Sequence, residues 1–184
     1  VRDTGPFGDP KGLTFGTAST PAVTLDASAD HTIPGAGNAS GGDIVLSTDL
    51  LVMNALSYTF KTAGPTSGDG DGGIVRIGVS NSTTLGANTA VSIIADATSA
   101  SAGTGNAQLG DINNPNLKRA IQLFPGNIPL VFAPTPTPGA FSLSANGGKG
   151  GGNAGMIFVV SGGVTLKDGE VLTAKAQAGN GTCQ

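Results

Sequence analysis

Two aspartates on a glycine-rich segment, Asp69 and Asp71, are the side chains of this sequence whose type and spacing best suit metal binding. They alternate with glycine in residues 67–73 (SGDGDGG), and alternate carboxylates on a flexible loop can approach one hard cation such as Ca²⁺. The segment lacks the other ligands of an EF-hand loop and does not recur at nine-residue intervals as calcium-binding β-rolls do. A solvated turn is the simpler interpretation, and a calcium site at Asp69 and Asp71 is the alternative prediction.

Nucleophilic catalysis has few candidate residues in this chain. A serine or cysteine nucleophile needs a base within reach, and the one histidine, His31, lies in a turn-rich stretch. Cys183 is the one cysteine, next to the last residue and with no evident partner base. We therefore expect no catalytic residues, no cofactor, and for Cys183 either a free thiol or a bond between chains.

Carbohydrate chemistry is the enzymatic alternative. A β-helical polysaccharide lyase would need calcium-binding acids and a basic residue, roles that Asp69, Asp71 and Arg76 could take. Asp168 and Glu170 alternate along a strand edge as paired carboxylates for glycoside hydrolysis could, although a hairpin turn explains them more simply.

The composition of the chain predicts that these residues lie on strands and turns. With 31 Gly, 11 Pro, no Trp and 11% charged residues, the sequence is poor in helix formers, while 38% hydrophobic residues are enough for a core. A net charge of -3 argues against nucleic-acid binding, and no apolar run approaches the roughly 20 residues that span a bilayer. The first residue is Val1, and no basic and apolar leader precedes it, so we expect either a mature processed form, which would have been exported, or a recombinant segment.

A glycine-led phrase opens a β-branched run three times, in residues 41–47, 72–80 and 151–161. The second glycine pair follows the first by 31 residues (72 − 41), and the glycine turn at Gly103 follows by another 31 (103 − 72). Repeated units of this length are typical of stacked β architectures. The prediction is an all-β, single-domain β-solenoid resembling a parallel β-helix, or a layered β-sheet with long turn-rich loops; a β-sandwich or jelly roll is the alternative.

The chain divides into an extended arm and a repeat domain. Residues 1–40 are rich in turn formers and contain two short strand patterns, whereas residues 41–184 hold the repeats. Prolines interrupt the repeats at about 111–140, which predicts an excursion from the scaffold with one helical turn at 117–123.

The order of glycines and strands within one repeat unit is similar to that of a known protein family. A glycine pair, a strand ending in Ser, a short strand around an Asn or Asp corner, a third strand and a glycine tract follow one another at 41–107 and 147–181. The best phrase runs from Gly152 through Asp168-Gly169 to Gly181. This order resembles the repeats of filamentous haemagglutinin-like proteins, and the resemblance implies a secreted or surface-held right-handed β-helix that acts in adhesion.

The expected function is a non-enzymatic extracellular structural or adhesive role, as a self-assembling filament subunit or adhesin segment at the cell surface. Subunits would pair through strand edges, the arm of residues 1–40 or Cys183, because a solenoid ends in unpaired backbone groups. Besides the lyase, a glycan- or ice-binding module stays open, in which ranks of threonine form a flat face. The candidates for that face are Thr83, Thr89, Thr165 and Thr173.

Overall fold

The computed structural model describes residues 12–29, 39–100, 102–107, 109–111, 114–126, 129–132 and 140–166. They form strands and turns with no helix, and the parallel strands stack as a β-solenoid of about three turns, which confirms the predicted fold class. The strands are β1 (Gly12–Phe15), β2 (Val23–Asp26), β3 (Ile44–Met53), β4 (Ser57–Lys61), β5 (Val75–Leu85), β6 (Ala90–Ile94), β7 (Leu109–Asp111), β8 (Asn114–Arg119), β9 (Ile121–Phe124), β10 (Pro129–Phe132), β11 (Phe141–Ser144), β12 (Ile157–Val159) and β13 (Gly163–Leu166).

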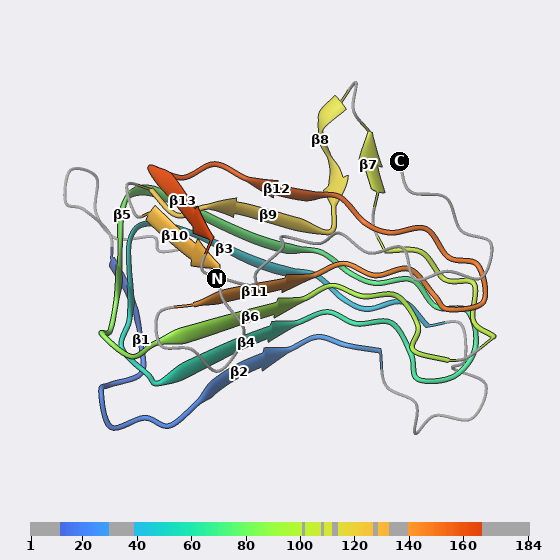
Figure 1. Ribbon diagram of the computed structural model, residues 1–184, viewed down its shortest axis with the longest axis horizontal. Coiled ribbons are helices and arrows are strands. Elements are labelled where there is room, and N and C mark those ends of the chain that lie inside the picture. Colours follow the sequence, from blue (N-terminus) through green and yellow to red (C-terminus); the bar gives the residue numbers. More distant parts are fainter. Residues whose placement is uncertain are drawn as a thin grey trace.

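Two parallel sheets form the walls of the solenoid (Figure 1). Sheet A has the order β1-β3-β5-β9-β12, and sheet B has the order β13-β10-β11-β6-β4-β2. From β1 to β6 the chain contributes strands alternately to sheet A and sheet B, so neighbouring strands come from successive coils. After β9 the chain adds two strands in succession to sheet B, and β11 lies between β6 and β10. An antiparallel pair, β7 and β8, projects from the stack.

The stacking interval varies along one coil. Hydrogen bonds near the start of β3 and along β5 join residues 31 apart, in agreement with the glycine spacing of the sequence. In the following glycine turn the stacked residues are 35 apart, so the turn at Gly103 lies on Gly68 rather than on Gly72. The extra residues are accommodated in the long strand β5 and in the turns.

A bulge bends sheet A halfway along its longest strands. In β3 the inward-facing residues alternate up to Thr48 and resume at Leu51, and β5 holds one more residue than β3 at this point. A bulge of this kind turns a strand without ending it. The sequence pattern suggested two strands at 44–47 and 50–52, whereas the structure has one bent strand, with β9 paired to the first half of β5 and β1 to the second half of β3.

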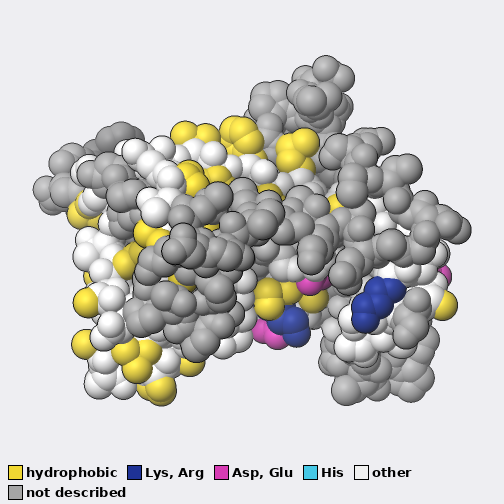
Figure 2. All heavy atoms as spheres, in the orientation of Figure 1, with side chains coloured by type: hydrophobic (Ala, Val, Ile, Leu, Met, Phe, Trp, Pro, Cys, Tyr) yellow, Lys and Arg dark blue, Asp and Glu magenta, His cyan; other side chains and the backbone are white. Residues whose placement is uncertain are grey.

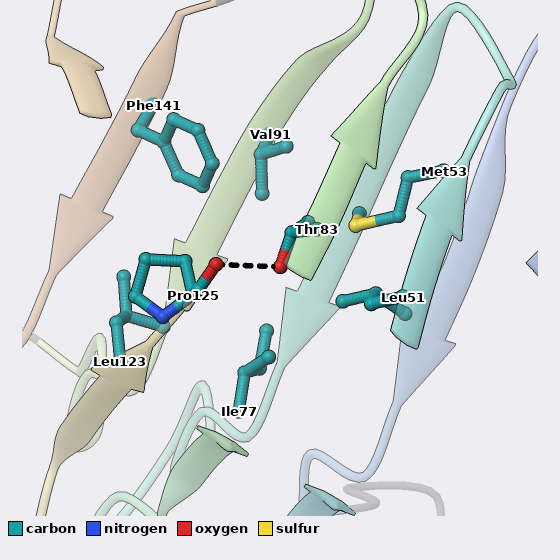
Figure 3. Close-up of a pocket in the computed structure, with 8 residues that line it drawn as sticks. All are labelled: Leu51, Met53, Ile77, Thr83, Val91, Leu123, Pro125 and Phe141. Carbon is teal, nitrogen blue, oxygen red and sulfur yellow. Dashed lines mark hydrogen bonds between the residues drawn. The ribbon is translucent and has the colours of Figure 1, made fainter. Parts of the chain in front are cut away.

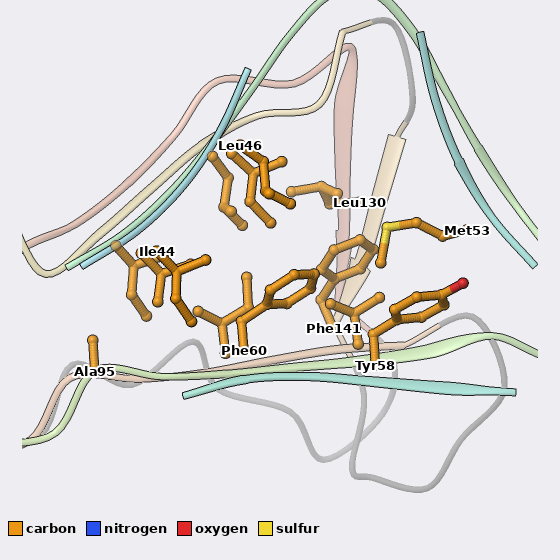
Figure 4. Packing of buried hydrophobic residues seen from close by; sticks show 14 of the residues in the cluster. Ile44, Leu46, Met53, Tyr58, Phe60, Ala95, Leu130 and Phe141 are labelled. Carbon is orange, nitrogen blue, oxygen red and sulfur yellow. The ribbon is translucent and has the colours of Figure 1, made fainter. Parts of the chain in front are cut away.

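The core fills the space between the sheets (Figure 4). Alternate side chains of each strand point inward, as a strand with one wet face requires, and Phe60 and Ile93 are fully buried. The ring of Tyr58 stacks near that of Phe60 at 6.4 Å between centroids, and Phe132 meets Phe141 edge-on at the same separation. The first contact lies within β4, and the second joins β10 to β11.

Parts of residues 1–40 and 111–140 contribute strands to the solenoid. The two short strand patterns of the predicted arm are β1 and β2, which pair in parallel with β3 and β4. The helical turn predicted at 117–123 is wrong, because Ile121 and Leu123 alternate inward and pair with β5 as strand β9. Strand β10 extends sheet B by pairing with β13.

Beyond the strands lies a glycine-rich end, which we define as residues 62–74, 95–107 and 145–155 together with 39–43 (right side of Figure 1). Here the outgoing and returning segments of one coil meet directly: Gly73 N donates to Thr62 O at 2.7 Å, and Gly155 N donates to Ala145 O at 2.8 Å. A Cβ on Gly73 would lie 2.0 Å from Gly42 O, so no larger residue fits. The glycine pairs of the sequence are therefore the points of backbone contact between segments.

Candidate functional site

Among the described residues, five carboxylates accept hydrogen bonds from the coil that follows them, and we call them the carboxylate ladder. Each bond runs the same way, with the acid in the earlier coil and the donor in the later one. The bonds are Asp43 Oδ1 to Ile74 N (3.2 Å), Asp49 Oδ1 to Ser80 Oγ, Asp69 Oδ1 to Thr104 N (2.8 Å), Asp71 Oδ1 to Asn106 N (2.6 Å) and Asp96 Oδ1 to Asn146 N (2.6 Å). The ladder joins neighbouring coils through groups that would otherwise face water.

The predicted metal ligands Asp69 and Asp71 both belong to this ladder. Asp69 also accepts from Thr104 Oγ1 at 3.1 Å, so each carboxylate already has a donor in the adjoining turn. Within the described ranges, no group of three or more His, Cys, Asp or Glu side chains is placed to hold a metal ion. Calcium binding stays a prediction, and a rise in melting temperature on adding Ca²⁺ but not Mg²⁺ would support it.

The remaining candidate catalytic residues are not gathered at one place in the described structure. Arg76 is exposed on the outer side of β5, in register with Val45 and Gln122, whereas Asp69 and Asp71 lie in the glycine-rich end. His31, Asp168, Glu170, Thr173 and Cys183 lie outside the described residues.

The threonines predicted for a binding face have different positions. Thr83 and Thr89 are buried, and their hydroxyls donate to Pro125 O (2.8 Å) and Ala55 O (2.7 Å), whereas Thr165 is exposed on β13. The register instead places another row of hydroxyls on the outer side of sheet B. Its members, paired in order across β2, β4, β6 and β11, are Thr24, Thr59, Ser92 and Ser142. Their equal positions within four short strands were the sequence signal for this row.

An apolar cavity lies where β9 leaves β5 (Figure 3). Its walls come from both sheets and include Leu51, Ile77 and Phe141, while Thr83 is satisfied by its bond to Pro125 O. The cavity volume is about 20 Å³, close to the minimum for one water molecule, and its lining offers that water no free polar partner. With this lining it is a gap in the apolar packing rather than a site for a polar ligand.

A polar pocket of about 100 Å³ lies at the junction of sheet B with the glycine-rich end. Two adjoining segments line it, residues 96–99 after β6 and residues 146–149 after β11, joined by a 2.8 Å bond from Ala97 N to Asn146 O. Asp96 and Lys149 supply its charged groups. We call it the Asp96 pocket; the sequence does not reveal it because Asp96 and Asn146 are 50 residues apart.

Charged side chains are sparse on the described surface, and they form small groups among uncharged ones (Figure 2). One such group is the ion pair of Asp26 and Lys61, with 3.8 Å between Oδ2 and Nζ. The Ser28 hydroxyl, then the Ser28 backbone amide and Lys61, hold the pKa of the Asp26 carboxyl below its ordinary value, against the opposing effect of partial burial. Asp26 and Lys61 thus connect the neighbouring strands β2 and β4.

No helix among the described residues has the length and apolar character needed to cross a membrane. Comparisons of the chain with protein-family models, curated proteins and solved structures found no match.

Proposed function

We propose that this protein is a non-enzymatic structural or adhesive component of a cell surface, whose copies assemble end to end by strand pairing. The observation that carries the proposal is the order of the sheets. Sheet A ends in β1 and β12, and sheet B ends in β2 and β13, each paired on one side among the described strands. Neighbouring strands within both sheets are parallel. The outer edge of β1 in one copy can therefore pair with the outer edge of β12 in another copy in the same parallel orientation as strands within the molecule.

Side-chain burial at the two ends supports the same proposal. The inward residues Leu13, Phe15 and Val23 of the first coil are half-buried, as are Ile157 and Val159 near the other end, although their counterparts in the middle coils are fully buried. A second copy stacked on either end would remove this apolar surface from water. Because the two ends differ, such contacts are heterologous and extend into a filament.

The carboxylate ladder supports a scaffold role. Asp43, Asp69 and Asp71 have the residue type of catalytic acids, yet their oxygens accept hydrogen bonds that hold coils together. The resemblance of the repeats to filamentous haemagglutinin-like proteins favours the same role. Adhesion and an extracellular location are parts of this proposal.

Charged substitutions at the ends test the assembly. Lysine on an edge strand opposes strand addition, so Val164→Lys in β13 should abolish concentration-dependent assembly in analytical ultracentrifugation and electron micrographs. Thr59→Lys is the control, because Thr59 faces outward on β4 inside sheet B, with Thr24 of β2 and Ser92 of β6 in register on either side. A wild-type chain that stays monomeric at high concentration would refute end-to-end assembly.

Thr14→Lys and Val52→Lys form a second pair, at the opposite end. The two residues occupy the same register column, Thr14 on the edge strand β1 and Val52 on β3 between β1 and β5. We expect assembly to fail in the first variant and to persist in the second.

A further inference from the structure

The Asp96 pocket has hydrogen-bonding capacity that the fold does not use fully. Asp96 Oδ1 accepts from Asn146 N and from Ser144 Oγ, both at 2.6 Å, and is well occupied. The contact of Oδ2 with Asn146 Nδ2 is 3.4 Å, at the long end of hydrogen-bond distances. A carboxylate oxygen can accept about two hydrogen bonds, so Oδ2 retains room for a ligand hydroxyl.

Two donors also line the Asp96 pocket. Lys149 is exposed and brings an ammonium group with three N–H bonds, and Ser99 is exposed and brings a hydroxyl. Gly147 is a buried lining residue with no side chain; a Cβ there would lie 2.3 Å from Gly152 O. Hydrogen-bond acceptors and donors therefore line the same small open cavity.

The charges select the class of ligand. Asp96 repels an anion such as phosphate, and Lys149 repels a metal cation, while the two charges together cancel. A neutral polyhydroxyl compound suits both the acceptor and the donors of the pocket, because each sugar hydroxyl can donate and accept a hydrogen bond. The outward hydroxyls of Ser92, Ser142 and Ser144 continue from the pocket along β6 and β11, where further sugar units could lie.

We propose that the Asp96 pocket binds a sugar residue of a neutral glycan. This inference rests on the adhesive part of the proposed function, to which it supplies a ligand class and a site. The pocket is formed within one copy of the chain, so binding does not require end-to-end assembly.

The test is a titration of the ¹⁵N-labelled full chain with cellotetraose, maltotetraose, mannotetraose and, as an acidic comparison, tetragalacturonate. We expect at least one neutral oligosaccharide to shift the amide signals of Thr98, Asn146 and Gly147 in a saturable way. Lys149→Met should weaken that affinity about tenfold, as loss of a hydrogen bond from a charged group does. Lys61→Met is the matched control on the same side of sheet B and should leave the affinity unchanged.

Asp96→Asn is the second variant, since its amide oxygen can still accept from Asn146 N and preserve the fold while Oδ2 is replaced by a donor. It should also lose affinity. Absence of saturable shifts with every neutral oligosaccharide would overturn the proposal, and so would stronger binding of tetragalacturonate or equal effects of Lys149→Met and Lys61→Met. Ultracentrifugation of the same samples separates the two ideas, because sugar binding by a strictly monomeric chain would refute assembly and leave the pocket standing.

Discussion

The strand-bearing walls and the glycine-rich end hold the same coils together by different means. Between the walls, large side chains such as Phe60 and Ile93 fill the space and are fully buried. At the glycine-rich end the segments lie too close for side chains, and backbone groups bond directly, as Gly73 N does to Thr62 O. One solenoid is thus stabilised by the packing of large apolar side chains along part of each coil. Along the rest, direct backbone hydrogen bonds between glycine-rich segments have that role.

The polar contacts differ in the same way. In the walls, a buried hydroxyl such as that of Thr83 on β5 donates to a nearby carbonyl, Pro125 O. In the glycine-rich end, Asp71 accepts from the backbone of the next coil, and Asn106 repeats this bond one coil further on, accepting from Asn153 N at 2.9 Å. In the glycine-rich end, hydrogen bonds to carboxylate and amide oxygens hold neighbouring coils together, as apolar side-chain packing does between the walls. The predictions below separate these contributions.

Removing volume from the walls should have the largest effect. Phe60→Ala should lower the free energy of unfolding by about 3–5 kcal/mol, because Phe60 is fully buried and the cavity would remain partly open. Leu56→Ala, at a side chain 49% exposed, should cost about 0.5 kcal/mol or less. Urea unfolding measures both, and equal losses would contradict a core supported by side-chain packing.

Adding volume to the glycine-rich end should come next. Gly73→Ala should cost about 3 kcal/mol, because its Cβ would lie 2.0 Å from a backbone oxygen that cannot move without its coil. Gly78→Ala is the control: its Cβ would meet nothing closer than Leu46 O at 3.9 Å, so a change of about 0.5 kcal/mol is expected. If both alanines proved equally tolerated in thermal unfolding, the close approach of the segments would be wrong.

The carboxylate ladder should contribute less per residue. Asp71→Ala leaves the amide of Asn106 without its acceptor and should cost about 1–2 kcal/mol. Asp71→Asn retains an acceptor oxygen, as Asn106 itself shows in the next coil, and should cost about 0.5 kcal/mol or less. Denaturant unfolding and amide exchange at Asn106 measure the difference, and a similar loss for the two variants would indicate that negative charge matters more than the hydrogen bond.

Two buried threonines, one in the glycine-rich end and one in the turn between β5 and β6, should respond in opposite directions. Thr62 is fully buried, and its hydroxyl has no hydrogen-bond partner among the residues that the structure describes, so Thr62→Val should raise the free energy of unfolding by about 1 kcal/mol. Thr89→Val should lower it by about 1 kcal/mol, because the hydroxyl donates to Ala55 O at 2.7 Å. Melting temperatures of both variants test the assignment; a destabilised Thr62→Val would show that this hydroxyl has a partner after all.

The smallest effect concerns Asp26 on the surface of sheet B. Because folding lowers its pKa, the ionised carboxylate stabilises the folded state above about pH 4, and that contribution is lost as the pH falls through the folded-state pKa. Asp26→Asn should therefore be less stable than wild type by a few tenths of a kcal/mol near neutral pH. The difference should vanish in acid; a difference independent of pH would contradict an ionic origin.

The strands were predictable because their signal is local. Alternation around Ile44 and Ile93, bounded by glycine, predicts a strand with one buried face wherever the chain folds. The helical turn at 117–123 failed because its pattern is too short to separate a helix from a strand, and pairing with β5 decided in favour of β9. The bend in β3 was missed because a bulge shifts the alternation by one residue, which resembles the end of a strand.

The carboxylates show where sequence reasoning stops. In the sequence, Asp69 and Asp71 resemble a pair of metal ligands because they alternate on one loop. In the structure, each accepts a hydrogen bond from a different backbone amide 35 residues further along. The Asp96 pocket has no sequence signal at all, since the residues between β6 and β11 include a long interruption of the repeat.

The sequence by itself determined an all-β chain with repeated glycine corners, because composition and alternation act within a few residues. Only the tertiary structure decided which residues stack on which, at offsets of 31, 35 or 50 along the chain. Those offsets follow from the lengths of bulges, turns and insertions that lie between the strands. They decide which oxygen meets which amide, and for that reason they also decide where the Asp96 pocket forms.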